Sequence, residues 1–493
     1  MAIFKRMNLK QGNTARTNAS QLTLRQSIYP ICLVTILFFL WHFQTILGID
    51  RARSAGLQAA YFGAYPLASL GHANWILRHY GFKLVFIWGL CLYGIGSLVA
   101  WPCLLYKSFG GFCAAIFIIG NGLGSLETAA NPYITICGPP RYSEMRINIS
   151  QAFNGIGTVV APVLGSYVFF KNTGTGENAL QNVQWVYLAI AIFVFILAVV
   201  FYFSPIPEIT DADMEFQAQE SHANTDDQPF WKQYRLFHAA FAQFCYTGMS
   251  SAQEPASVAK PCLIRGQIGA QVAIAGYFIN YVSENRANTG DSLAAQFLAG
   301  AQGAFAMGRF IGSGIMKFVR PRWVFLVYLG LCIVFIAPSI TQRGNTGLAM
   351  LFLTLFFESI CFPTIVALGM RGLGKHSKRG SGWIVGGVCG GAVVPPILGA
   401  VADIYDNTAP AMSVPLAFFI AAWTYAICVN FVPAYRIPAD RLGETKIGVE
   451  DAAAGVHDEE NMKGDEMFGV SSEKGGIEQV ESNTNSEEIR DVR

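Results

Sequence analysis

A few acidic and amide side chains stand inside apolar stretches of this sequence. Glu127 lies in the apolar stretch 110–137, between Asn121 and Asn131. An ionisable group near the middle of a bilayer costs at least a few kcal/mol, so its presence points to a function. A low-dielectric environment favours the neutral form of a carboxyl, which then takes up and releases protons near neutral pH. Glu127 is therefore the predicted proton-coupling residue; the alternative is a packing acid.

Two amides follow in the next apolar stretch. Gln151 and Asn154 are three residues apart and share one helix face. Their donors and acceptors match the paired hydroxyls of a sugar better than they match an ion. The alternative is that they only join helices. We predict the same binding role, with packing as the alternative, for a larger set: Glu127, Asn131, Asn280, Gln302 and Phe362, and further Gln243, Gln296, Trp383 and Trp423.

An acid five residues before a proline occurs twice. "ETAANP" runs from Glu127 to Pro132 and "ESICFP" from Glu358 to Pro363, and a Gly/Pro-rich apolar stretch follows each. Repeats in a membrane chain are typical of transporters built from two pseudo-symmetric halves. We predict a gating or structural role for the two prolines, which free backbone groups of their helices. Glu358, which lies nearer the start of its stretch, is expected to be structural.

One arginine belongs to the same group of candidates. Arg309 stands in the apolar segment "MGRFIGSG". We predict that it orders a cytoplasmic gate around the eighth helix, with a substrate contact as the second reading.

The elements that position these residues are transmembrane helices. Apolar residues make up 53% of the chain and charged residues 13%, whereas soluble proteins have about a quarter charged. A helix needs about 20 residues to cross about 30 Å of hydrocarbon. This rule predicts an all-α membrane protein with twelve spans: 28–49, 54–76, 83–105, 110–137, 149–170, 182–204, a split seventh, 292–318, 322–341, 346–371, 380–402 and 411–432.

Other classes of protein find no support in the sequence. No phosphate-binding glycine loop and no nucleophile–base pair stands out, so an enzyme is not expected. The 11 cysteines fall almost singly in apolar spans, which predicts small buried hydrophobes and neither a metal site nor a cofactor. The partners expected are a small molecule, protons and the lipid bilayer, with no nucleic acid and a monomeric chain.

The placement of charge predicts the orientation. Basic residues without acids precede the first span, and short basic loops alternate with loops poorer in Lys and Arg. The positive-inside rule then puts both termini in the cytoplasm, and the plasma membrane is the default location. The predicted segments are a cytoplasmic segment 1–27, a six-helix bundle 28–204, a solvated cytoplasmic linker 205–232, a second six-helix bundle 233–435 and a disordered acidic tail 436–493.

Several motifs give the chain a family resemblance. These are "SAGLQAAYFGAY" (54–65), "LYGIGSLVAWP" (92–102), "GLGSLETAANPY" (122–133), "RINISQAFNGIGTVVAPVLG" (146–165) and "FPTIVALGMRGLG" (362–374). The chain resembles the fucose/proton symporter (L-fucose permease) family of the major facilitator superfamily, in its fungal branch, over roughly 28–435. The resemblance implies two six-helix bundles around a central sugar site, with Glu127 as the carboxylate for sugar and proton coupling and Gln151 and Asn154 as sugar contacts.

Two departures from that family are visible. The family's first helix continues into a polar segment whose aspartate helps to bind sugar and proton; here "LFFLW" passes straight to "HFQTILGID", and the next acid is Asp50. The seventh span is split at Gly248 and Ala270 by residues 249–269, whose composition is that of a loop. We interpret the first as a skipped segment and the second as an insertion, with a genuine re-entrant loop as the alternative.

These observations predict proton-coupled transport of a monosaccharide (fucose, galactose or glucose-like) by alternating access, impaired if the missing first-helix acid is required. The alternatives are a non-transporting sugar sensor that signals through its tail and an uncoupled sugar facilitator. One sequence does not distinguish these sugars, because the geometry of the cavity selects hydroxyl stereochemistry.

Overall fold

The computed structural model describes residues 22–39, 60–106, 108–164, 177–220, 229–247, 270–392 and 394–444, and these residues are helical apart from short connections. The first half contains α2 (Leu24–Phe39), η3 (Leu67–His72), α4 (Ala73–Tyr80), α5 (Phe82–Leu105), α6 (Phe109–Ile136), α7 (Ser143–Leu164) and α8 (Glu177–Phe203). The second half contains α10 (Tyr234–Thr247), α11 (Ala270–Asn285), α12 (Asp291–Ile315), α13 (Pro321–Ser339), α14 (Gly344–Glu358), α15 (Cys361–Met370), α16 (Ser377–Gly386), η8 (Gly387–Ala392), α17 (Val394–Tyr405), α18 (Thr408–Ala411), α19 (Ser413–Phe431) and α20 (Pro433–Glu444).

Seven helical runs of the described chain are long and apolar enough to cross a membrane: 82–105, 109–136, 184–203, 321–339, 344–370, 374–405 and 408–431. They match seven of the twelve predicted spans within a few residues. The other predicted spans are shorter or more polar helices, or they run into residues outside the described ranges. The predicted first span, for instance, is described only as the 16-residue α2.

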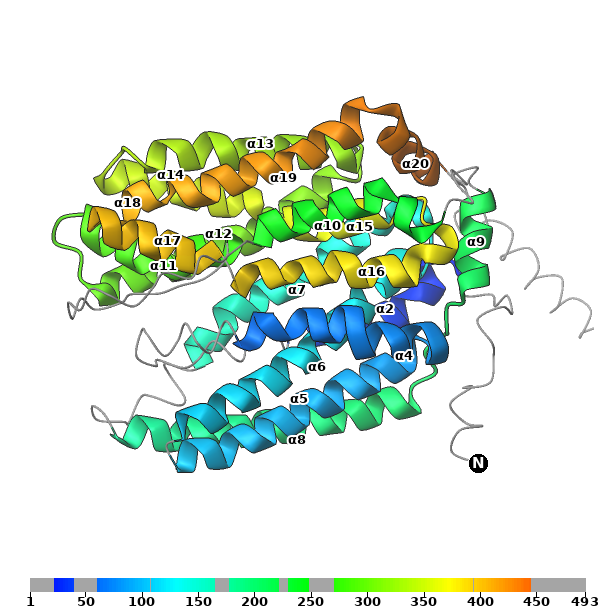
Figure 1. Cartoon of the computed structure of the whole chain (residues 1–493), viewed down its shortest axis with the longest axis horizontal. Helices are drawn as coiled ribbons and strands as arrows, with labels where there is room; N and C mark the ends of the chain where they lie inside the picture. The colour runs from blue at the N-terminus through cyan, green and yellow to red at the C-terminus, as the bar shows by residue number, and fades with distance from the viewer. Residues whose placement is uncertain are drawn as a thin grey trace, which may run out of the picture. The chain divides into compact units, whose positions relative to one another are not determined.

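Small residues set the packing of the first half. α6 packs along α5, and α5 along α8, so that the three helices lie side by side (Figure 1). Gly122 of α6 faces the backbone of α5, where an added Cβ would lie 2.6 Å from the Tyr93 nitrogen, and Gly89 faces Gly122 in turn. Such close helix contact without a side chain between the backbones is typical of membrane bundles.

The linker between the halves differs from the prediction. Residues 205–232 were expected to be a solvated linker, but they contain α9 (Asp211–Glu220) and the short helix η6 (Phe230–Lys232). The Asp213 carboxylate accepts from the Thr210 amide at 2.9 Å, and the Thr210 hydroxyl accepts from the Asp213 amide at 3.2 Å, which is a capping box. α9 contacts η7 (Gly374–His376) and α16 of the second half (Figure 1).

The split seventh span consists of two helices, α10 and α11. α10 packs on α15, α16 and α19, whereas α11 packs mainly on α12 and α14. The proposed insertion 249–269 lies outside the described residues, as do most of the tail and the region that follows Phe39. The predictions on the missing first-helix segment therefore stay predictions.

Candidate functional site

A chain of buried polar side chains crosses from α6 to α7. Asn131 donates to Glu127 Oε1 at 3.4 Å, and Gln151 Nε2 donates to Asn131 Oδ1 at 3.2 Å. Asn154 then donates to Gln151 Oε1 at 3.3 Å. Glu127, Asn131 and Gln151 are almost fully buried, and Asn154 is half-buried. The structure thus brings together the four polar residues of the first half that the sequence nominated.

Two tyrosines that sequence reasoning missed complete this chain at the Glu127 end. The Tyr61 and Tyr65 hydroxyls lie 3.2 Å apart, and both interact with the Glu127 carboxyl. They are one helical turn apart on the segment that begins at residue 60. Their i, i+4 spacing was the available signal, but buried tyrosines are common in any helical core.

Arg309 of α12 joins the polar chain from the second half. Its Nη1 donates to the backbone oxygen of Gln151 and, at 3.5 Å, to Gln151 Oε1, while its Nε donates to the Ser359 carbonyl at 2.8 Å. The guanidinium lies 4.6 Å from the centre of the Phe305 ring. Arg309 therefore connects the amide chain of the first half to the break between α14 and α15.

Each proline of the repeated signature frees a backbone carbonyl, and each freed carbonyl accepts a hydrogen bond from a side chain of another helix. Pro lacks an N–H, so the carbonyl four residues earlier loses its helical partner. For Pro132 this is Thr128, whose oxygen accepts from the Ser381 hydroxyl at 3.3 Å. For Pro363 it is Ser359, whose oxygen accepts from Arg309. Each of these two carbonyls therefore has a donor from another helix, and the gating or structural role of the prolines stays a prediction.

Glu358 occupies the corresponding position in the second half. It is the last residue of α14 and lies midway along the apolar run 344–370, deeper than the sequence suggested. Its backbone oxygen accepts from the Tyr246 hydroxyl at 2.8 Å. Its side chain is completely buried, and neither carboxyl oxygen has a hydrogen-bond partner within the described part of the chain.

Other buried groups near these helices share this unused hydrogen-bonding capacity. Among the described residues, Glu127 Oε2, Asn154 Oδ1 and both amide atoms of Gln243 also have no partner. Gln243 is one turn before Tyr246 on α10 and is completely buried. Buried polar groups are nearly always paired, so unpaired groups of this kind need an explanation, such as a ligand or a water.

The remaining candidates are distributed more widely. Asn280 of α11 and Gln302 of α12 are half-buried, and Phe362 of α15 is 8% exposed. Trp383 packs at 5.2 Å from the Phe237 ring, and the Trp423 indole donates to the Leu326 carbonyl at 3.1 Å. These contacts support the packing alternative for both tryptophans.

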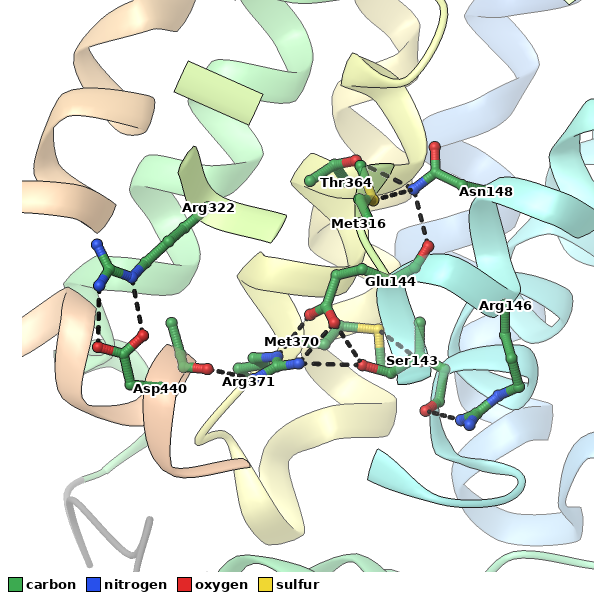
Figure 2. Close-up of polar contacts among 12 residues, drawn as sticks. Ser143, Glu144, Arg146, Asn148, Met316, Arg322, Thr364, Met370, Arg371 and Asp440 are labelled. Atoms are coloured by element: carbon green, nitrogen blue, oxygen red, sulfur yellow. Dashed lines mark hydrogen bonds and ion pairs between the residues drawn. The ribbon is translucent and has the colours of Figure 1, made fainter. Parts of the chain in front are cut away.

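A second polar cluster holds the two halves together at one end of the bundle (Figure 2). Arg371, just after α15, pairs with Glu144 of α7 through Nε to Oε1 and Nη2 to Oε2, both at 2.5 Å. Arg371 Nη1 also donates to the Ala439 carbonyl of α20. Glu144 is 1% exposed, so this bidentate pair is shielded from solvent. Sequence reasoning missed it, because the partners are 227 residues apart.

Further contacts between the halves flank this ion pair. Asn148 Nδ2 donates to the Thr364 hydroxyl at 3.1 Å, as Figure 2 shows, and to the Glu144 carbonyl at 2.8 Å. On the other side, Asn74 donates to the Lys378 carbonyl at 2.8 Å. A Cβ at Gly382 would collide with the Ser69 carbonyl oxygen, so α16 lies directly against the first half. The two halves are therefore closed at this end.

The linker strengthens this closed end. Asp211 of α9 lies 3.5 Å from Lys378 Nζ, and Glu208 accepts from the Phe82 amide at 2.5 Å at the start of α5. Burial raises the pKa of Glu208 to about 7, although its bonds from the Phe82 and Lys83 amides lower it. Burial also raises the pKa of Asp211, and the charge of Lys378 opposes that shift. α9 therefore ties the linker to the first turn of α16.

Comparison with protein families supports the fold. A sequence model of the Major Facilitator Superfamily matches residues 26–396. The L-fucose-proton symporter of Escherichia coli (strain K12) is 28% identical over 431 residues, covering 82% of this chain and 93% of the symporter. A glucose/galactose transporter of Brucella abortus is 28% identical over 413 residues, covering 81% and 92%. These relatives are bacterial, so the fungal branch stays a prediction.

Comparison with solved structures agrees. The crystal structure of the major facilitator transporter FucP in the outward conformation superposes with a TM-score of 0.66 at 28% identity, covering 81% of this chain and 98% of FucP. A proton:xylose symporter, XylE, gives a TM-score of 0.58 at 12% identity, which supports the fold alone. The predicted all-α, twelve-helix fold class and the family resemblance are confirmed.

Proposed function

Because the chain belongs to the major facilitator superfamily, we propose that it carries a monosaccharide together with protons across a membrane by alternating access. The observation that carries this proposal is the set of buried carboxyl and amide groups with unused hydrogen-bonding capacity on α6, α7 and α10. The hydroxyls of a sugar both donate and accept, so they supply the partners that such groups lack. The names of the relatives point to L-fucose, D-glucose and D-galactose as the sugars to try.

Each residue has a defined task in this proposal. Glu127 takes a proton from the side to which the site opens, and Asn131, Gln151 and Asn154 bind the hydroxyls of the sugar. Breaking the amide chain between α6 and α7 costs its hydrogen bonds, and the sugar replaces them with its own. Asn280, Gln302 and Phe362 complete the site from the second half. The inward proton gradient contributes about 2.3 kcal/mol per charge for each 100 mV.

The second part of the mechanism is a gate. We assign the end closed by the Glu144–Arg371 pair to the cytoplasm, because Lys378, Arg371 and further basic residues gather in its loops. Access to the site is then from outside, and the FucP structure in the outward conformation is a matching precedent. Release of sugar and proton requires this pair, and the contacts of Arg309 with Gln151, to break. Pro132 and Pro363 give the helices the freedom to change their packing.

The location of the protein follows from these assignments. The chain is a multi-pass membrane protein, and we propose the plasma membrane as its site, with 1–27, 205–232 and 436–493 in the cytoplasm. A monomer is sufficient, because both halves of the site come from one chain.

The test is uptake of labelled L-fucose, D-glucose and D-galactose, with recording of external pH, in cells that express the chain, its E127Q variant or no transporter. The proposal is supported if the chain accumulates sugar while the medium becomes more alkaline, and if the E127Q variant no longer accumulates sugar. Flux without proton movement indicates a facilitator. Binding without flux indicates a sensor, whose signalling is lost when the tail 436–493 is exchanged.

A repaired chain provides a further comparison. It lacks 249–269 and carries an acid-bearing segment after Trp41. Transport by the repaired chain alone would mean that at least one of the two departures prevents transport, whereas transport by the chain as it stands would mean that the first-helix acid is dispensable.

A further inference from the structure

The carboxyl group of Glu358 has no role in the proposed transport cycle. It lies where α14 ends, its side chain has no exposed surface, and among the described residues neither of its oxygens has a hydrogen-bond partner. An ionised carboxylate in this position would lack the compensation that a buried charge requires. A carboxyl without a partner inside a membrane protein is therefore either permanently neutral or part of a switch.

The nearest cation is already engaged elsewhere. Arg309 donates to the Gln151 backbone and side chain and to the Ser359 carbonyl, the residue next to Glu358. Its charge nevertheless acts on both Glu358 and Glu127. Through these bonds one guanidinium is joined to the residue after Glu358 and to the amide chain that ends at Glu127, the buried carboxyls of the two halves. It balances one negative charge, so the second carboxyl must carry a proton.

The other groups that face Glu358 do not change this balance. They are the Tyr246 hydroxyl of α10, the Cys361 thiol of α15 and the Cys332 thiol of α13. α11 also packs on α14, and its Tyr281 hydroxyl is used in a bond of 2.8 Å to the Ser339 carbonyl. None of these side chains is a cation. Arg309 is thus the cation that reaches Glu358 in the described part of the chain.

We propose that Glu358 is a second proton-binding carboxyl, and that Arg309 binds in turn to Gln151 of the first half and to Glu358. While Arg309 holds Gln151, Glu358 is neutral. When the halves separate here, Arg309 releases the Gln151 carbonyl and pairs with Glu358, whose O–H bond breaks and whose proton leaves to the side that has opened. Returning the proton restores the first arrangement. This inference rests on the proposed proton-coupled transport, because it adds a proton to the same cycle.

The decisive experiment does not need a sugar. The purified full-length chain, its E358Q variant and its E127Q variant are titrated with acid and base while infrared difference spectra record the C=O stretch of protonated carboxyls. We expect a discrete component that E358Q removes and E127Q leaves in place. An E358D variant that restores a titrating component, displaced in frequency, excludes a general disturbance of the fold. Spectra of E358Q and the parent chain that superimpose over the whole titration would overturn the proposal.

A transport measurement separates this inference from the function on which it rests. If no sugar is transported, the proposed function fails, while the infrared result still decides whether Glu358 titrates. If the chain accumulates sugar, E358Q should lower the steady-state accumulation about fifty-fold, the ratio that one charge sustains across about 100 mV. Exchange of sugar without a gradient should persist in E358Q. Unchanged accumulation in E358Q would contradict a second coupled proton.

Discussion

The two copies of the acid–proline signature share a freed carbonyl but differ in backbone and in surroundings, because α6 continues through Pro132, whereas α14 ends at Glu358 and α15 begins at Cys361. In both, a proline frees the carbonyl of the residue after the acid, and a side chain from another helix donates to it. Around Glu127 the neighbours are amides and tyrosine hydroxyls. Around Glu358 the neighbours are apolar or weakly polar, apart from Arg309.

This difference shows which residues of a repeat determine its chemical role. The repeated residues set the freed carbonyl next to the carboxyl, and the residues that are not repeated determine what the carboxyl does. An amide chain that a ligand can replace suits the binding of hydroxyls. Where two carboxyls share one cation, one of them holds a proton, so the pair can store a proton. The first copy is therefore suited to select the substrate, and the second to store charge.

The strongest test of this comparison removes the shared cation. Arg309→Met leaves the Ser359 and Gln151 carbonyls without their donor and removes the one cation that the two buried carboxyls share. We expect a loss of stability of about 3–5 kcal/mol, as for other broken buried pairs, measured as thermal unfolding in detergent. Arg320→Met is the control, because that side chain is 56% exposed in its ion pair with Asp440 and should cost below about 1 kcal/mol. Equal losses of stability for the two variants would show that Arg309 contributes no more to the contact between the halves than an exposed arginine does.

A glycine of α12 provides the next test. A Cβ at Gly308 would collide with the Phe356 carbonyl oxygen and lie 2.6 Å from the Ser359 hydroxyl, so alanine there pushes α12 away from the break after Glu358. We expect a loss of about 1–3 kcal/mol, typical of overpacking. Gly303→Ala on the same helix meets nothing within 4 Å and gains up to about 1 kcal/mol of helix propensity. The sign of the change should therefore differ between two alanines five residues apart.

Local patterns in the sequence predicted the seven long helices and nominated the residues of the first polar chain, but not the hydrogen bond that joins α6 to α7. Apolar runs of sufficient length fix the spans, and the three-residue spacing of Gln151 and Asn154 places them on one face. The position of Arg309 depends on how α12 docks on α7, where a Cβ at Gly155 would lie 3.1 Å from Ala306. The pairing of Glu144 with Arg371 depends on how the halves meet. No pattern within either segment encodes these contacts between distant helices.

The amide chain itself is open to a more specific test. Gln151 is central to it, with bonds to Asn131, Asn154 and Arg309, whereas Asn154 stands at its end. Gln151→Ala should weaken sugar binding about tenfold, the value of one good hydrogen bond, and Asn154→Ala should weaken it less. Binding of L-fucose, D-glucose and D-galactose to the purified chain by calorimetry measures both. A larger effect of Asn154→Ala would move the centre of the sugar site toward the end of the chain.

The smallest effects concern single hydrogen bonds to backbone oxygens in the two copies of the signature. Tyr246→Phe removes the donor to the Glu358 carbonyl, a bond of 2.8 Å, and Ser381→Ala removes the donor to the Thr128 carbonyl at 3.3 Å. A buried acceptor left without a partner costs about 1–3 kcal/mol, and the longer bond should cost the lower end of that range or less. Thermal unfolding of both variants, with Tyr106→Phe at a 79% exposed position as the control, gives the order. If Ser381→Ala costs more than Tyr246→Phe, then the contact between the halves at Thr128 contributes more to the stability of the bundle than the tyrosine bond within the second half.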